Sequence, residues 1–301
     1  MKSSQIDLTV DLGGLKLVNP VIAASGTFGY GLEFAEFVDL DQLGGFSTKG
    51  LSLKPQAGCP VPRVIETPSG MLNAIGLENI GLEKFLREKI PMLRNYKTAL
   101  IVNFFGKTCN EYSEMANALS GEDRVDALEM NISCPNVQEG KLFFSSDSQT
   151  AANVVRSARK ATDKFLIVKL SPNVTDITEI ARAVEGEGAD AISLINTLLG
   201  MSIDIDTGRP YLGNQTGGLS GPGIKPVALR MVYEAVRSVK IPIIGLGGIQ
   251  NAEDAMEFLM AGANAIQIGT ANFLDPSVTI KVLNGLVSLC SEKGINRLAD
   301  L

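Results

Sequence analysis

Eight short apolar runs, rich in β-branched residues, alternate along this chain with longer stretches of helical pattern. They are residues 21–24, 45–48, 99–103, 127–131, 165–170, 191–196, 243–247 and 265–268. The runs are continuous rather than alternating in polarity, which is typical of parallel strands buried on both faces. Eight strand–helix repeats within 301 residues predict an α/β fold, the (β/α)8 TIM barrel, with an open doubly wound sheet as the alternative.

The stretches between the strands predict both helices and insertions. Helical spacing of apolar residues predicts helices over 175–186, 225–239 and 251–261, and Asn251 is the expected N-cap of the last one. Residues 50–98 and 197–224 are too long for a simple crossover and rich in glycine and proline. We expect them to form loop or hairpin insertions at the C-terminal rim of one domain, residues 1–301.

Composition argues against several classes of protein. The net charge of −6 and the lack of a Lys/Arg cluster argue against a nucleic-acid surface. No apolar run approaches the ~18 residues that span a bilayer, and residues 1–7 contain no hydrophobic signal region. The four cysteines form no C-x-x-C pair and have no histidine to complete a zinc site. We therefore expect a soluble cytoplasmic protein with no membrane segment and no structural metal.

The absence of histidine draws attention to Cys134, which follows the predicted strand 127–131. Without histidine, proton transfer near neutral pH must use another side chain, and a cysteine thiol has an ordinary pKa of about 8.5. Pro135 stops the strand directly after this thiol. A small buried cysteine is the simpler interpretation for a lone thiol, but the flanking amides of Asn131 and Asn136 favour a catalytic base.

Polar residues or glycines end nearly all of the predicted strands. Active sites of TIM barrels lie at these carboxyl ends, so such residues would converge on one rim. The glycines after the last two strands predict a phosphate site, since backbone N–H groups without side chains can approach a phosphate closely. The strand-end residues are Ser25, Gly26, Thr48, Lys49, Gly50, Asn103, Asn131, Cys134, Lys169, Asn196, Thr197, Gly247, Gly248, Gly269 and Thr270.

Lys169 supports two interpretations. Flanked by apolar residues, its ammonium could face an anion in the barrel mouth, or it could form a Schiff base as in an aldolase. The amides of Asn73, Asn131 and Asn196 favour the first, because an amide matches the N–H and C=O edges of a cyclic imide or pyrimidine.

Together these residues resemble the class 1 dihydroorotate dehydrogenases, flavin enzymes of pyrimidine synthesis. The resemblance covers nearly the whole chain. It rests on Asn19-Pro20-Val21, Ala24-Ser25-Gly26, Ser47-Thr48-Lys49, Asn73-Ala74-Ile75-Gly76-Leu77, Asn131-Ile132-Ser133-Cys134-Pro135-Asn136, Leu194-Ile195-Asn196-Thr197, Gly217-Gly218-Leu219-Ser220-Gly221 and Gly247-Gly248-Ile249.

The resemblance implies a role for each site residue. Cys134 would be the base that removes a proton from C5 of dihydroorotate while hydride leaves C6 for FMN. Lys169 would stabilise the charge that develops on the flavin. FMN would be held by Ser25, Lys49, Gly50, Asn103, Asn131, Lys169, Ile195, Gly221, Gly247, Gly248, Gly269 and Thr270. Dihydroorotate would be held by Lys49, Asn73, Ala74, Ile75, Gly76, Leu77, Asn131, Asn196 and Thr197.

Within class 1, the stretch Thr197–Met201 with Ile203-Asp204 resembles the B type. That likeness implies a homodimeric core joined to an electron-transfer subunit, which carries FAD and a 2Fe–2S cluster and reduces NAD. One departure is that residues 138–147 lack the glycine expected beside phenylalanine in the lid that carries Cys134. The alternatives are a fumarate-linked A type, another FMN barrel acting on a dihydropyrimidine, a Schiff-base lyase and a non-catalytic binding subunit.

Overall fold

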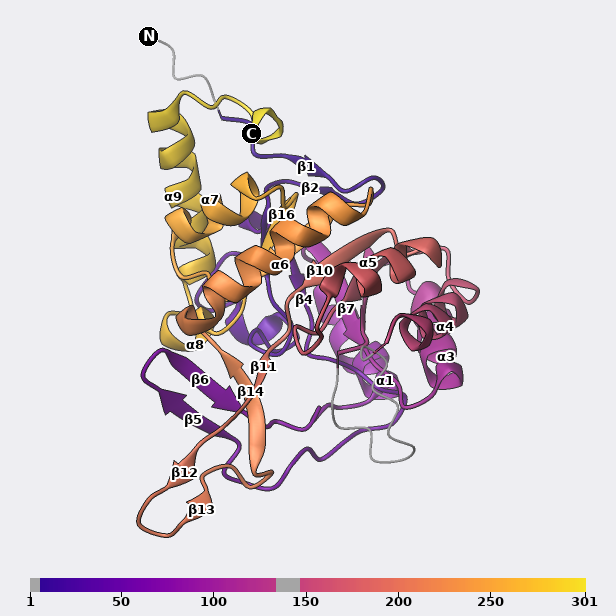
Figure 1. Ribbon diagram of the computed structural model, residues 1–301. Coiled ribbons are helices and arrows are strands. Elements are labelled where there is room, and N and C mark those ends of the chain that lie inside the picture. The colour runs from indigo at the N-terminus through magenta and orange to yellow at the C-terminus, as the bar shows by residue number, and fades with distance from the viewer. Residues whose placement is uncertain (1–5, 134–146) are drawn as a thin grey trace.

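A closed barrel of eight parallel strands forms the centre of the molecule (Figure 1). The computed structural model describes residues 6–133 and 147–301. In barrel order the strands are β3 (Val21–Ala23), β4 (Gly45–Ser47), β7 (Ala99–Phe104), β8 (Ala127–Asn131), β9 (Phe165–Lys169), β10 (Ala191–Leu194), β15 (Ile243–Leu246) and β16 (Ala265–Ile268). The predicted TIM barrel is confirmed: seven of the predicted runs each contain one of these strands, and β7 extends one residue beyond its run, to Phe104.

Helices follow most of the barrel strands and cover the outside of the barrel. The three predicted helices are confirmed, and the Asn251 side chain caps α7 by accepting from the Asp254 backbone N–H at 2.8 Å. The α-helices are α1 (Leu82–Lys84), α2 (Ile90–Leu93), α3 (Cys109–Ser120), α4 (Ser148–Arg159), α5 (Ile177–Gly186), α6 (Lys225–Ser238), α7 (Ala252–Met260), α8 (Ala271–Leu274) and α9 (Val278–Lys293). A π-helix, η3 (Phe85–Lys89), joins α1 to α2, and short 3-10 turns are η1 (Leu32–Phe34), η2 (Leu40–Gln42), η4 (Pro222–Ile224) and η5 (Leu298–Asp300). No helix in the described ranges is long and apolar enough to cross a membrane.

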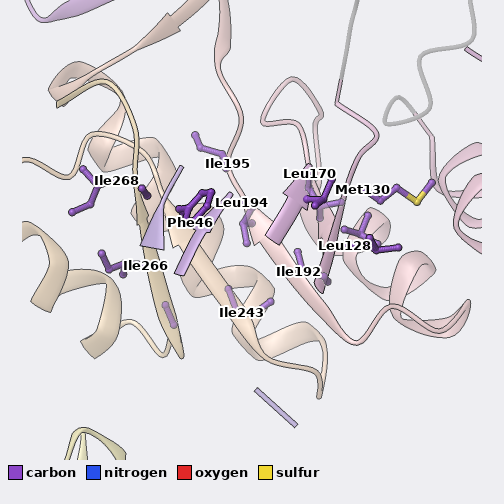
Figure 2. Packing of buried hydrophobic residues seen from close by; sticks show 14 of the residues in the cluster. Phe46, Leu128, Met130, Leu170, Ile192, Leu194, Ile195, Ile243, Ile266 and Ile268 are labelled. Carbon is purple, nitrogen blue, oxygen red and sulfur yellow. The ribbon is translucent and has the colours of Figure 1, made fainter. Parts of the chain in front are cut away.

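Successive residues of each barrel strand point alternately toward the helices and into the barrel. The outward residues form the main hydrophobic core; Figure 2 shows Leu128, Met130, Ile192 and Ile266 beside their strands. This arrangement explains why the runs read as continuously apolar, since both faces of each strand are buried.

The amino ends of the strands are closed by a separate apolar cluster. The hairpin of β1 (Val10–Asp11) and β2 (Lys16–Leu17) crosses this end, and its residues Leu12, Leu15 and Leu17 are buried there. They pack with inward residues of seven barrel strands: Ile22, Ala99, Ile101, Ala127, Ile167, Ala191, Ile244 and Ala265. In the described part of the chain the amino ends of the strands are therefore filled by side chains, and the cavity of a TIM barrel is expected at the carboxyl ends.

The two long insertions form hairpin strands, as predicted, and these strands pair with one another. A four-stranded antiparallel sheet has the order β11-β14-β6-β5, comprising β5 (Val64–Thr67), β6 (Gly70–Asn73), β11 (Leu198–Met201) and β14 (Thr216–Ser220). The small hairpin of β12 (Ile203–Asp204) and β13 (Arg209–Pro210) extends beyond it. This sheet and the β1–β2 hairpin lie at opposite ends of the barrel (Figure 1). The insertions therefore build the predicted rim at the carboxyl ends.

Candidate active site

A cavity of about 860 Å³ lies between the carboxyl ends of the barrel strands and the inserted sheet. Small-molecule sites commonly occupy about 300–1,000 Å³, so this cavity is large enough for a cofactor together with a small substrate. Its walls come from residues after the barrel strands and from both insertions. The fold thus places one large cavity where active sites of TIM barrels lie.

The cavity brings together nineteen of the twenty predicted site residues. They are Ser25, Lys49, Gly50, Asn73, Ala74, Ile75, Gly76, Leu77, Asn103, Asn131, Lys169, Ile195, Asn196, Thr197, Gly221, Gly247, Gly248, Gly269 and Thr270. The twentieth, Cys134, lies outside the described residues, as does the lid stretch 138–146. The nineteen described positions span residues 25–270, so their convergence is a property of the fold rather than of any local motif.

Glycine loops after β15 and β16 form one wall of the cavity. Gly248 has φ +77°, and a Cβ there would lie 2.9 Å from the Gly221 carbonyl oxygen. Nearby, the Thr270 Oγ1 donates to the Ser220 Oγ at 2.8 Å, which ties this wall to the inserted strand β14. At Gly248 the backbone has a positive φ and is closely surrounded by other backbone atoms. A side chain at this position would therefore force the loop to move. These glycines thus form a close-packed wall of the cavity, at the place where the sequence predicts a phosphate site.

Beneath the cavity, Glu129 of β8 is fully buried at the centre of a network of hydrogen bonds and one ion pair that we call the floor network. Its members are Ser47, Asn103, Glu129, Lys169, Ser193 and Gln267, from six different barrel strands. Burial raises the pKa of Glu129, but the nearby Lys169 ammonium and the hydrogen bonds from Ser47, Asn103 and Gln267 outweigh it, so the pKa lies below its ordinary value. Glu129 is therefore ionised, and it is the acidic partner of Lys169 at 3.9 Å.

Asn103 connects the floor network to the cavity. Its Nδ2 donates to Glu129 Oε2 at 2.7 Å, while its Oδ1 is buried and has no hydrogen-bond partner in the described part of the chain. Leaving a buried acceptor unpaired costs about 1–3 kcal/mol. Because Asn103 lines the cavity, this oxygen is suited to accept an N–H from a ligand.

An amide cluster lies where β8 and β10 end. Asn131 Oδ1 accepts from the backbone N–H and the hydroxyl of Ser133, at 3.1 and 2.5 Å. The Asn196 Nδ2 donates to the same Ser133 hydroxyl, and Asn196 Oδ1 accepts from the Thr197 N–H at 2.8 Å. These bonds fix the orientation of both amides at the end of the segment that continues into Cys134.

The insertion between β4 and β7 supplies a second charged side of the cavity. Lys49 Nζ lies 3.7 Å from Glu78 Oε2, and the same carboxylate oxygen accepts from Arg63 Nη1 at 2.9 Å. Asn73 of β6 donates through Nδ2 to the Gly218 carbonyl at 3.3 Å, across the β6–β14 pairing. Lys49 and Asn73 thus reach the cavity from segments held by long-range contacts.

Several polar residues of the site were missed in the sequence. Glu129, Ser193 and Gln267 fall inside their strands, whereas the prediction rests on residues at strand ends; Ser47 ends β4, one residue before the predicted strand end at Thr48. A charged residue within an apolar strand run is an available signal, because a buried charge needs a partner. Glu129 could have been found in this way, but its partners could not. Ser133, Ser171 and Asn173 also line the cavity.

Comparison with known proteins identifies the family of this chain. The family described as dihydroorotate dehydrogenase matches residues 7–290. Its similar relatives include two that carry the name dihydroorotate dehydrogenase B (NAD(+)), catalytic subunit. That of Trichlorobacter lovleyi is 57% identical over 98% of this chain and 97% of its own, and that of Pelobacter propionicus is 56% identical with the same coverage. The resemblance found in the sequence is confirmed.

Among solved structures, the fold matches that of DHODH from Eimeria tenella. The crystal structure in complex with ferulenol has a TM-score of 0.82 at 22% identity and covers 100% of this chain and 89% of that one. The ligand-free form has a TM-score of 0.83, also at 22% identity, with 99% and 91% covered. These likenesses support the TIM barrel, and the sequence matches identify the family. The chain belongs to the dihydroorotate dehydrogenase family of oxidoreductases.

Proposed function

We propose that this chain binds FMN and dihydroorotate in the cavity and oxidises dihydroorotate to orotate in pyrimidine synthesis. The observation that carries the proposal is the convergence of nineteen predicted site residues on one cavity of about 860 Å³. Family membership supplies the reaction class, since the relatives are named dihydroorotate dehydrogenases. We further propose that residues 1–301 form one FMN-binding domain in the cytoplasm.

The chain's residues suit FMN at both ends of that molecule. The glycine wall at Gly247, Gly248 and Gly269 suits a terminal phosphate, because its backbone can approach closely. The unpartnered oxygen of Asn103 suits the N–H of a flavin ring, and the Lys169 ammonium suits its electron-rich edge. Ser25, Lys49, Gly50, Asn131, Ile195, Gly221 and Thr270 complete the proposed FMN site.

Dihydroorotate would occupy the side of the cavity formed by the insertion. Lys49 provides a cation for its carboxylate, and the amides of Asn73, Asn131 and Asn196 match its ring N–H and C=O groups. The fixed amide cluster would orient the ring without rearrangement, which favours reaction. Ala74, Ile75, Gly76, Leu77 and Thr197 are the remaining proposed contacts.

The proposed reaction removes two hydrogens from neighbouring carbons. Cys134, as thiolate, takes the proton from C5, and the electron pair left on C5 forms the new C5–C6 double bond. Bound FMN supplies the acceptor for the hydride that leaves C6. Lys169 offsets the negative charge that this transfer brings to the floor of the cavity. The products are orotate, a proton held on Cys134 and a hydride, with its two electrons, passed to the acceptor that bound FMN would supply.

Electrons would leave the chain through a partner. The relatives are named catalytic subunits of a NAD(+) enzyme, which implies another subunit. We propose that it carries FAD and a 2Fe–2S cluster, and that two copies of this chain form the core of the assembly. The fumarate-linked A type is the second candidate.

The identity of the flavin is the first testable point. The purified chain should be yellow and should release FMN rather than FAD on denaturation, because the glycine wall suits one terminal phosphate. Chromatography of the released flavin checks this. Release of FAD from the chain without its partner would contradict the proposal.

The electron acceptor provides a second test. The isolated chain should reduce artificial acceptors with dihydroorotate but should transfer poorly to NAD, because it has no G-x-G-x-x-G dinucleotide fingerprint. Steady-state rates with each acceptor would show the difference, and adding the partner subunit should restore NAD reduction. Efficient fumarate reduction would instead indicate the A type.

A further inference from the structure

The floor network contains an ionised carboxylate that the proposed reaction does not use. Glu129 Oε1 accepts from Ser193 Oγ at 2.9 Å and from Gln267 Nε2 at 2.7 Å. Glu129 Oε2 accepts from Ser47 Oγ and from Asn103 Nδ2, both at 2.7 Å. A carboxylate has about four acceptor positions, and all four are filled by donors. The group is therefore held as an anion in one orientation.

This arrangement determines what the floor presents to the cavity. Because Glu129 takes the N–H of Asn103, that amide must turn its oxygen away from the carboxylate, and this oxygen is buried and unpartnered. Gln267 is oriented in the same way: its Nε2 donates to Glu129, and its Oε1 has no hydrogen-bond partner among the described residues. The carboxylate thus fixes the orientation of both amides, so that each turns its oxygen rather than its nitrogen away from Glu129.

The same carboxylate acts on Lys169. The two side chains are 5% and 0% exposed and their charged atoms lie 3.9 Å apart, so solvent screens them weakly. The register places Lys169 beside Asn131 on one neighbouring strand and beside Ser193 on the other, so its stem is fixed between two barrel strands. A ligand beside Lys169 would therefore experience the combined electric field of the ammonium and the Glu129 carboxylate rather than that of an isolated cation.

From this geometry we infer that Glu129 is a positioning residue that holds Asn103 and Lys169 toward the cofactor and limits the positive field on it, thereby setting the redox potential of the bound flavin. The inference rests on the proposed FMN site. Reduction adds negative charge to the flavin, and a buried anion nearby opposes that charge. Glu129 therefore keeps the reduced cofactor from being over-stabilised, which favours passing its electrons onward.

The decisive experiment compares the binding of oxidised and reduced FMN by the apoprotein, without turnover. In Glu129→Gln the side chain keeps its shape, and its amide can still accept from Asn103, but the charge is lost. The ratio of the Kd for oxidised FMN to the Kd for reduced FMN should rise at least about tenfold. For a two-electron couple this raises the midpoint potential by about 30 mV.

Two further variants test whether the Kd ratio depends on the charge of Glu129 or on the packing around it. Ser193→Ala removes one donor to Glu129 but keeps the carboxylate, and Glu129→Asp keeps the charge on a shorter stem. Both should lower the Tm while the Kd ratio stays within threefold of wild type. The inference would be overturned if the Kd ratio of Glu129→Gln stayed within threefold of wild type. It would also be overturned if Ser193→Ala changed the Kd ratio as much as Glu129→Gln does.

Removing one member of a buried ion pair can prevent folding, so a second comparison uses Lys169. Lys169→Met should lower the Kd ratio at least about tenfold, and adding Glu129→Gln to it should return the ratio to within threefold of wild type. If the double variant has the same Kd ratio as Lys169→Met alone, the carboxylate does not act on the flavin. A wild-type apoprotein that binds no FMN would instead overturn the proposed function, and the inference with it.

Discussion

Replacing Cys134 by alanine should slow reduction of bound FMN by dihydroorotate at least ~10²-fold, the lower end of what a positioned base contributes. FMN should stay bound, because the glycine wall lies on the loops after β15 and β16 and is tied to the inserted sheet, away from this segment of the sequence. Stopped-flow absorbance under anaerobic conditions measures the rate directly. Cys109→Ala is the matched control, since Cys109 begins α3 and does not line the cavity.

The pH dependence tests the role of the thiol more closely. In wild type the rate should rise with pH as the thiolate forms, since a thiol ordinarily has a pKa of about 8.5. Cys134→Ser should recover part of the rate and only at higher pH, because a hydroxyl ionises far less readily. If Cys134→Ala reduces its flavin at the wild-type rate across this range, the base must be sought at Lys49 or Lys169.

Substituting Gly248 by alanine should weaken FMN binding about 10- to 100-fold. At φ +77° an added Cβ lies 2.9 Å from the Gly221 carbonyl oxygen and 3.0 Å from the Lys225 backbone nitrogen. Strain of this kind costs about 1–3 kcal/mol, and the loop can relieve it only by moving from the position that a phosphate would share. Titration of the apoprotein with FMN, followed by flavin fluorescence, measures the change.

A second glycine provides the control for this prediction. Gly186 ends α5, is exposed, and a Cβ there would meet nothing within 4 Å. Gly186→Ala should therefore bind FMN as wild type does. Wild-type affinity in Gly248→Ala, with its Tm unchanged, would show that this loop does not hold the cofactor.

The features of the fold that could be predicted are those that depend on residues close together in the sequence. The β8 strand Ala127–Asn131 and the β16 strand Ala265–Ile268 match their predicted runs, and Asn251 is the N-cap that its sequence position indicated. Each of these features depends on neighbouring residues alone, through periodicity or a capping hydrogen bond. The closed barrel follows from counting eight such units, because parallel strands joined by helices bury both faces.

Pairing between the two insertions could not be predicted in the same way. Asn73 and Gly218 are partners in neighbouring strands although 145 residues separate them. Both insertions are rich in glycine and proline, which mark turns but do not specify a partner strand. The wall that encloses the cavity therefore depends on a contact between distant segments that no local signal encodes.

The sequence by itself determined the barrel, the order of its strands and helices, and the residues that end each strand, because these depend on short-range periodicity and on the rule that carboxyl ends share one rim. Tertiary structure alone decided that Glu129 would be surrounded by Ser47, Asn103, Ser193 and Gln267, and that the Asn103 Oδ1 would be buried without a hydrogen-bond partner in the described part of the chain. These donors come from five strands besides that of Glu129 when the ion pair with Lys169 is included. Their convergence depends on strand register around a closed barrel, in which a shift of one residue would turn every inward side chain outward.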